Sequence, residues 1–441
     1  MRLRKHIFVV GAVLAGTAVA LSGCSGTSGG GSSSSSGVKG QTVNISGAFT
    51  GQQATAFQAD VSAWAKPLGL TVKYSGSDSF QTSIVTQVKG GQAPDVAIFP
   101  APGVLKGLVS QGMVPLDDLI DLKSATSDEA SGLPTIAQVS GKTYGLAYSI
   151  NVKSLVWYNP AAFTAAGYTV PASDADLVAL QQKIISDGKG SPWCVGDKDG
   201  WPMTDWLEEY VLRYGGLTKY NDWISHKLLF DSPLVKKAAA KVADTIFAPG
   251  AVNGGQTAIT ATPFSTAGNN LFVTGAANGQ CFMMRQGTFI TGFFPADIQA
   301  QIAKGDLTNV NAFPLPTPAD AVTSGALGGG DIVGAFKKSD AVKAVVSYLV
   351  GKEFGTHGYA KQWSSFLSPH NGFDASQYAS PFQGIAAKAV SSAKTFGFDA
   401  SDQMPGAVGS GTEWTELTAW AGGKQSIDAT LKNIDASWPT N

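Results

Sequence analysis

The sequence has little charge and few of the residues that build metal or nucleotide sites. Only 14% of the chain is charged, against about a quarter in a typical soluble domain. The four histidines fall in no H-E-x-x-H spacing, and no P-loop is present. These absences exclude the common metalloprotease and phosphate-binding motifs, and the sequence therefore predicts no metal and no cofactor.

A membrane-spanning run and an excess of basic charge are also missing. The apolar run from Ile7 to Leu21 has 15 residues, fewer than the roughly 20 that span a bilayer. It follows Arg2, Arg4 and Lys5, which is the pattern of a secretory signal. Those three residues are among the 31 basic ones, so the remainder has 28 against 32 acidic residues, a net charge of −4 with histidine neutral. We expect no nucleic-acid partner.

The segment after the apolar run resembles a bacterial lipobox. Leu21-Ser22-Gly23-Cys24 stands directly after the apolar run. The resemblance implies a signal peptide over 1–23 and a lipidated Cys24 as the first mature residue. The alternative is an ordinary cysteine beside a conventional cleavage site. Residues 24–40 are nearly all Ser, Gly and Thr, and such a tether reaches roughly 20–24 Å.

Cys194 and Cys281 are the other two cysteines. In an oxidising compartment two leftover cysteines usually pair. The bond would close a loop of roughly 90 residues and stabilise the fold by about 4 kcal/mol in the chain-entropy model. Two free buried thiols are the alternative.

Residues 42–109 predict three strands that alternate with three helices. The predicted strands are Thr42–Ser46, Leu70–Tyr74 and Pro94–Phe99, and each precedes apolar residues at helical spacing. This order predicts an α/β fold with a parallel sheet wound with helices. Loops at the carboxyl ends of such strands line the ligand crevice. We therefore expect near the crevice Phe49, Thr50, Gln52, Gln81, Phe99 and Pro100.

Two later stretches predict crossings between two lobes. The first is Gly145–Lys153, which leads into the strand-like Leu155–Asn159, and the second is the glycine-rich Leu327–Val333. Further predicted helices are Asp174–Ser186, Asp340–Leu349, Trp414–Trp420 and Ile427–Ile434.

The stretch Gly200–Tyr210 holds two tryptophans, an aspartate, two glutamates and a tyrosine within eleven residues. Thr204 or Asp205 can cap a helix that starts near Trp206. An indole face beside carboxylate oxygens suits a sugar, because its ring has an apolar face and a rim of hydroxyls. Alternatively, Trp206 and Leu207 are core residues and the acids are solvated.

Several segments together resemble the extracellular solute-binding proteins of bacterial ABC importers, in the carbohydrate-binding family that includes maltodextrin-binding proteins. The resemblance rests on Pro94–Phe99, on Gly141–Asn159, on Met404-Pro405 with Trp414, and on Ile427–Leu431, and it covers essentially the whole mature chain. It implies a two-lobed periplasmic-binding-protein-like (type II) fold, each lobe a sheet flanked by helices, with the ligand cleft between the lobes. The expected lobes are 41–149 with 332–375 and 150–331 with 376–441.

The same resemblance implies the ligand and its contacts. Trp193-Cys194, Gly200–Trp206 and Cys281 resemble the branch that handles α-glucosides and related short oligosaccharides. Aromatic faces would stack on the sugar and carboxylates would accept from its hydroxyls. The expected aromatic contacts are Trp206, Trp414, Phe289 and Tyr148, and the expected acids are Asp331, Asp402 and Asp205. The resemblance also implies hinge closure, permease partners, a monomer, and a lipid anchor on the outer face of the cell membrane.

Structural roles compete with each of these assignments. Every aromatic can be core packing, Asp331 can be a turn residue, and Asp402 can be a helix cap. A secreted glycosidase with two carboxylates is the main rival function, with Asp205 and Glu208, or Asp331 and Asp402, as the pair. A sensor or adhesin on the same fold and a binder of another small solute are further alternatives.

Overall fold

The computed structural model describes residues 37–77, 79–129, 132–393 and 395–439. The predicted signal segment, Cys24 and the tether up to residue 36 lie outside these residues, so lipidation and cleavage stay predictions. No helix among the described residues combines the length and the apolar character that crossing a bilayer requires.

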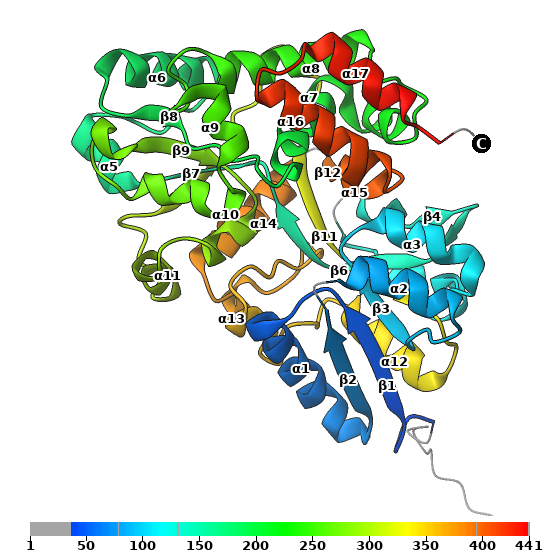
Figure 1. Ribbon diagram of the computed structural model, residues 1–441. Coiled ribbons are helices and arrows are strands. Elements are labelled where there is room, and N and C mark those ends of the chain that lie inside the picture. Colours follow the sequence, from blue (N-terminus) through cyan, green and yellow to red (C-terminus); the bar gives the residue numbers. More distant parts are fainter. Residues whose placement is uncertain (1–36, 78, 130–131, 394, 440–441) are drawn as a thin grey trace, which may run out of the picture. The chain divides into compact units, whose positions relative to one another are not determined.

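The strands of this part of the chain form a six-stranded sheet, a four-stranded sheet and a two-stranded hairpin (Figure 1). The strands are β1 (Thr42–Gly47), β2 (Thr71–Gly76), β3 (Val96–Phe99), β4 (Gln138–Val139), β5 (Lys142–Thr143), β6 (Gly145–Val152), β7 (Leu155–Tyr158), β8 (Ser191–Trp193), β9 (Cys281–Arg285), β10 (Asn311–Pro314), β11 (Ala326–Ala335) and β12 (Phe396–Phe398). The helices are α1 (Gly51–Ala65), α2 (Phe80–Lys89), α3 (Pro102–Leu108), α4 (Leu122–Ala125), α5 (Pro160–Ala166), α6 (Asp174–Asp187), α7 (Trp201–Ile224), α8 (Pro233–Val242), α9 (Gly255–Ala261), α10 (Phe264–Ala267), α11 (Ala296–Ala303), α12 (Asp340–Leu349), α13 (Tyr359–Gln362), α14 (Pro381–Ser392), α15 (Ala400–Gln403), α16 (Trp414–Ala421) and α17 (Ile427–Ala436).

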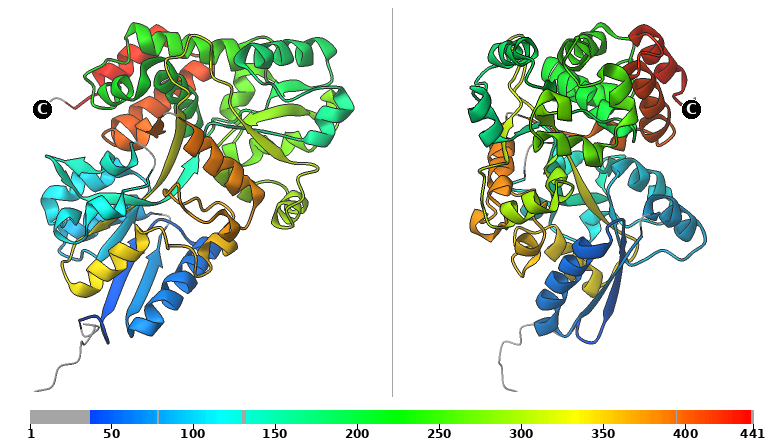
Figure 2. Two further views of the ribbon diagram at one scale, coloured as in Figure 1. Left: turned by 180° about the vertical axis from the view of Figure 1, so that it is seen from behind. Right: turned by 60° about the vertical axis from the view of Figure 1, so that its left-hand side comes forward.

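The six-stranded sheet runs in the order β12-β11-β3-β1-β2, and β6 also pairs with β11. Side chains alternate across it as a two-faced sheet requires. Val96 and Ile98 of β3 pack with α1 and α12 on one face, and Ala97 and Phe99 pack with α2 and α3 on the other. Figure 2 shows these layers from behind and from the side. The sequence predicted this α/β arrangement.

The direction of the strands corrects one expectation. β1 is parallel to both β2 and β3, as predicted. β11 runs antiparallel to β3 and to β6. β11 contains the second predicted crossing and lies between β12 and β3, so the sheet is mixed. The strand–helix order of residues 42–109 carries no information about a strand that arrives more than 200 residues later.

The four-stranded sheet has the order β10-β7-β9-β8, with antiparallel pairs except β8 with β9. One face packs on α5, α6, α7 and α8, and the other packs on α11 and α14. Cys194 and Cys281 form the predicted disulfide beside this last pair, with 5.4 Å between their Cα atoms.

The chain passes between the two sheets along adjacent strands. β6 and β11 pair over seven registered positions, and β12 lies on the other side of β11. Glycine permits this approach: a Cβ at Gly328 would lie 2.1 Å from the carbonyl oxygen of Asn151, and one at Gly330 would lie 2.3 Å from that of Ser149. These strands are the crossings that the sequence predicted. The lobe boundaries assigned there stay a prediction.

Candidate functional site

The helix α7 begins five residues earlier than the sequence predicted. Gly200 precedes it with a φ of +87°, and Pro202 stands in its first turn, where a missing N–H costs nothing. Trp201 is therefore the first helical residue and is half-buried. Its ring lies 4.8 Å from that of Phe264 and 5.7 Å from that of Phe289, edge to face.

Trp414 lies beside this group. A Cβ at Gly200 would be 3.1 Å from the Cβ of Trp414, so the start of α7 touches the start of α16. We call Trp201, Phe264, Phe289 and Trp414 the aromatic wall. All four are half-buried, so each combines core packing with an accessible part. Two of them, Trp414 and Phe289, were predicted site residues.

Asp331 and Asp402 are half-buried carboxylates. They lie near each other and near Lys153, because the charges of Asp331 and Lys153 both influence the pKa of Asp402. Within the described residues neither carboxylate has a hydrogen bond or ion pair. Burial raises the pKa of Asp331 to about 7. Burial and the nearby Asp399 raise the pKa of Asp402 well above its usual value. Asp331 stands at a register shift in β11, and such bulges re-aim side chains.

Asp205 does not offer a free carboxylate, which corrects its predicted role. It is 1% exposed, and its Oδ1 accepts from the ammonium of Lys153 at 2.7 Å. Lys153 also donates to Asp399 Oδ2 at 2.5 Å and lies 5.2 Å from the centre of the Trp201 ring. Asp205 thus belongs to a buried ion cluster behind the aromatic wall.

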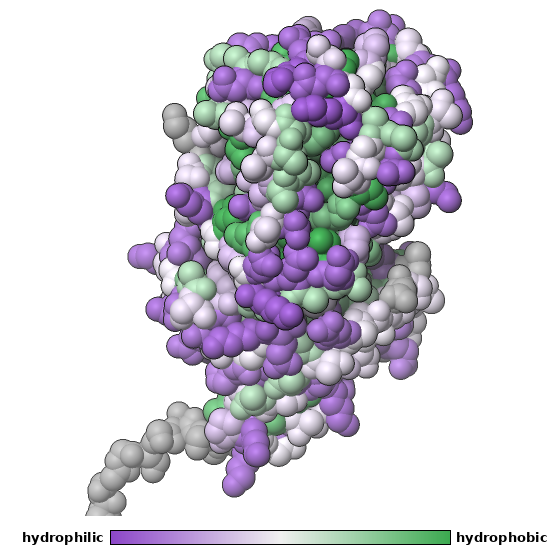
Figure 3. All heavy atoms as spheres, turned by 90° about the vertical axis from the view of Figure 1, so that its left-hand side faces the viewer, coloured by the Kyte–Doolittle hydropathy of each residue, from purple (hydrophilic) through white to green (hydrophobic). Residues whose placement is uncertain are grey.

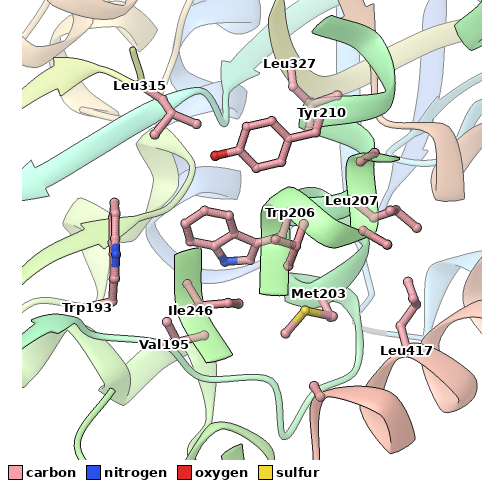
Figure 4. Close-up of a cluster of buried hydrophobic side chains, with 14 of the residues drawn as sticks. Trp193, Val195, Met203, Trp206, Leu207, Tyr210, Ile246, Leu315, Leu327 and Leu417 are labelled. Atoms are coloured by element: carbon pink, nitrogen blue, oxygen red, sulfur yellow. The ribbon is translucent and has the colours of Figure 1, made fainter. Parts of the chain in front are cut away.

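Trp206 is likewise corrected from a stacking residue to a core residue. Figure 4 shows its indole among Trp193, Val195, Met203 and Tyr210. It is 2% exposed, and its ring meets that of Trp193 edge to face at 5.5 Å. Because α7 starts at Trp201, position 206 points into the lobe, and the alternative of core packing was right.

The other predicted contacts lie on the side of the six-stranded sheet. Phe99 and Tyr148 are buried in the core, at 0% and 1% exposure, which contradicts a free stacking face for either. Phe49 is 8% exposed and stacks on Tyr74 at 4.3 Å. Gln81 is exposed near the start of α2. Only Phe49 of these four lines the cavity described next.

A cavity of about 890 Å³ lies between helices and loops that pack on the two sheets. One side comes from the start of α1 and from the segment around α13. The other comes from α11 and from Thr291 and Gly292, which follow Phe289 by two and three residues. Its lining residues are Ala48, Phe49, Thr50, Gln52, Gln53, Thr291, Gly292, Gln299, Ile302, Ala303, Lys361, Gln362, Trp363, Ser364, Ser365, Tyr378 and Ala379. Figure 3 shows the face of the molecule on this side, with hydrophobic residues in its middle and hydrophilic ones below.

The sequence missed Trp201, Phe264 and Lys153 as site residues. The signal for Trp201 was present, because a glycine followed by X-Pro is a strong helix start. Lys153 carried no signal, since its two acidic partners stand 52 and 246 residues away. Asp205, Glu208 and Asp399 lie close enough together to hold an ion, but the ammonium of Lys153 already pairs with two of them.

Comparison with known proteins identifies the family of this chain. A family model for bacterial extracellular solute-binding proteins matches residues 50–356. The osmoprotective compounds-binding protein GgtB of Synechocystis is 33% identical over 402 residues, which cover 90% of this chain and 92% of that protein. The alpha-glucosides-binding periplasmic protein AglE of Rhizobium meliloti is 32% identical over 415 residues, covering 91% and 88%.

Solved structures show the same two-lobed fold. The bacterial solute receptor AcbH matches with a TM-score of 0.73 at 20% identity, over 91% of this chain and 98% of that one. The cyclic alpha-maltosyl-1,6-maltose binding protein of Arthrobacter globiformis matches with a TM-score of 0.65 at 18% identity, over 90% and 97%. The fold is therefore the periplasmic-binding-protein-like fold that the sequence predicted, and the chain belongs to the family of bacterial extracellular solute-binding proteins.

Proposed function

We propose that this protein binds a short oligosaccharide or related glucoside for an ABC importer. One observation carries the proposal: Lys153 lies 5.2 Å from the centre of the Trp201 ring in the aromatic wall and also acts on the pKa of Asp402. The wall is therefore near Asp402 and its neighbour Asp331, two half-buried carboxylates that have no partner among the described residues. Indole and phenyl faces cover the apolar side of a sugar ring, and carboxylates accept from its hydroxyls. The names of AglE and GgtB, which refer to α-glucosides and osmoprotective compounds, support this ligand class.

The mechanism is binding with closure. The cavity between α1, α13 and α11 takes its lining residues from segments that pack on the two sheets, α1 on one and α11 on the other. Its Thr291 and Gly292 follow Phe289 of the aromatic wall closely in the chain, so a ligand that extends from the wall into the cavity would touch both lobes at once. Contacts made only in the closed state shift the population towards that state. The closed form is what permease subunits in the membrane would recognise. A monomer suffices for this task.

Lipid anchoring through Cys24 completes the proposal. The lipobox-like Leu21–Cys24 and the Ser/Gly-rich tether would hold the two lobes near the outer face of the cell membrane. Mass spectrometry of the cell-associated protein tests this part. A diacylated Cys24 at the mature amino terminus supports it, and an unmodified terminus at another residue refutes it.

The rival glycosidase has fewer candidate residues than the sequence offered. Asp205 is held by Lys153. Glu208 accepts from the backbone amides of Ala400 and Ser401 and from the hydroxyl of Tyr220. Asp331 and Asp402 stay available for acid and base roles, so the test must examine whether the sugar survives.

The test is a titration of the domain from residue 38 with α- and β-linked di- and trisaccharides, followed by tryptophan fluorescence and calorimetry. We expect saturable binding of one sugar class and recovery of that sugar uncleaved. Trp201→Ala should weaken binding about 5- to 150-fold, because an aromatic face in a site contributes about 1–3 kcal/mol. Trp64→Leu is the matched control, since Trp64 is half-buried against Tyr348 at the far end of α1. Absence of binding by every sugar would refute the ligand class, and cleaved sugar would establish the glycosidase.

A further inference from the structure

Asp197 is a buried carboxylate in the loop between β8 and α7, and it stands between the two helices that carry the tryptophans of the aromatic wall. It is 0% exposed. Its Oδ1 accepts from the backbone N–H of Met203 at 2.9 Å, and its Oδ2 accepts from the hydroxyl of Thr418 at 2.7 Å. The bond from Met203 is buried, and the bond from Thr418 is partly buried.

The first bond supplies what α7 lacks at its start. The first N–H groups of a helix have no partner within it, and the residue before α7 is Gly200, which has no side chain to cap it. The carboxylate of Asp197 takes that place from three residues further back. It thereby fixes the first turn, where Trp201 stands two residues before Met203.

The second bond reaches α16. Thr418 lies four residues after Trp414, so the two share one face of the helix. Asp197 thus binds both helices: it accepts from Met203, two residues after Trp201, and from Thr418, four residues after Trp414. The backbone at Gly200 also touches Trp414, because a Cβ there would lie 3.1 Å from the Cβ of Trp414.

We propose that Asp197 is a positioning residue of the ligand site: its carboxylate joins α7 to α16 and so sets the spacing between the indoles of Trp201 and Trp414. This inference rests on the proposed function, in which those indoles contact the ligand. Stacking surfaces need positions held within fractions of an ångström, and a carboxylate that accepts from both helices provides this without touching the ligand.

Asn is the conservative replacement that the geometry allows. Burial raises the pKa of Asp197 to about 7, and the nearby acids Asp199 and Asp205 raise it as well, while the bonds from Thr418 and Met203 lower it. The site therefore tolerates an uncharged group. The amide oxygen of Asn can accept from Met203, and its NH₂ can donate to the Thr418 hydroxyl.

The experiment measures affinity for the best sugar of the panel and urea unfolding in the same variants. Asp197→Ala should weaken affinity about tenfold or more, since small misplacements of binding groups have large effects. Thr418→Val, which removes only the bond to α16, should weaken it about three- to tenfold. Asp197→Asn should stay within about threefold of the parent protein.

A matched control separates positioning from general loss of stability. Asp435 on α17 accepts from the backbone N–H groups of Phe230 and Asp231, in the same lobe but away from the aromatic wall. Asp435→Ala should lower stability and leave affinity unchanged. In the background of Trp201→Ala, the effect of Asp197→Ala should shrink, because one of the two groups it positions is gone.

The outcomes are distinct. If the parent protein binds no sugar, the proposed function fails. If it binds, and Asp197→Ala or Thr418→Val binds equally well, the positioning role is refuted and the proposed function stands. If Asp197→Ala does not fold, the other two variants test the inference. Unchanged sugar affinity in Thr418→Val overturns it, and so does complete loss of sugar affinity in a folded Asp197→Asn.

Discussion

Replacing Lys153 by Met removes the cation from the ion cluster behind the aromatic wall. Lys153 is 6% exposed and sits at the first crossing. Its ammonium pairs with Asp205 and Asp399, whose side chains are 1% and 4% exposed. Methionine keeps most of the side-chain volume, so the change leaves Asp399 without its counter-ion and Asp205 with only Arg285, which lies 4.0 Å away.

The expected loss is large. Removing one partner of a buried ion pair costs about 3–5 kcal/mol, because the remaining charge has no compensation. For a urea dependence of about 3 kcal/mol per molar, this shifts the unfolding midpoint down by about 1–1.7 M. Lys183→Met is the matched control, since Lys183 pairs with Asp187 at 2.9 Å on the surface and is 53% exposed. The unfolding midpoint of Lys183→Met should equal that of the parent protein within experimental error.

The loss should depend on pH in one direction. Burial already raises the pKa of Asp205 to about 6, although Lys153 lowers it. Without the lysine the pKa of Asp205 rises further above its unfolded value near 3.8. The deficit of Lys153→Met is then full above the raised pKa and shrinks as the pH falls and the carboxyl takes up a proton. A midpoint shift no larger than that of Lys183→Met, or a deficit that grows on acidification, would refute the reasoning.

Three further predictions follow. Replacing both Cys194 and Cys281 by Ser should lower the free energy of unfolding by about 4–5 kcal/mol in the chain-entropy model for a separation of 87 residues. The urea midpoint of this variant should equal that of the reduced parent protein, and a midpoint equal to that of the oxidised parent protein would contradict the prediction. Trp206→Phe should lower stability by about 1–3 kcal/mol through the space it leaves in the core with little change in sugar affinity, and calorimetry showing the reverse would restore its ligand role. Burial raises the pKa of Asp331 to about 7, so the affinity of the parent protein for a hydroxyl donor should fall as the pH drops below 7. Asp331→Asn should bind more weakly at pH 8, and its affinity should depend less on pH. If the affinity of Asp331→Asn depends on pH as that of the parent protein does, the carboxylate lies outside the site.

Local sequence patterns predicted several of the regular helices and strands. The helix Asp340–Leu349 was predicted with its observed bounds, and Trp414 was predicted to begin the helix α16. These segments have a capping residue or a regular apolar period. The disulfide also followed from counting, because two cysteines in an oxidising compartment have only each other.

The site was harder to predict because it depends on where one helix begins. The prediction placed the cap at Thr204 or Asp205, whereas α7 begins at Trp201. That shift exchanged the roles of two tryptophans on the same helix, turning Trp206 inward. The partner of Asp205 is Lys153, and a contact across 52 residues leaves no periodic trace in the sequence.

The close approach of β6 and β11 has a mechanical consequence for closure. With no Cβ at Gly328 or Gly330, the carbonyls of Asn151 and Ser149 fill the space beside the partner strand. Two crossings that pair along seven registered positions bend together, so we expect one shared hinge axis in place of two independent joints. A single axis would leave the lobes one soft direction of motion, along which the two sides of the cavity would approach or separate together.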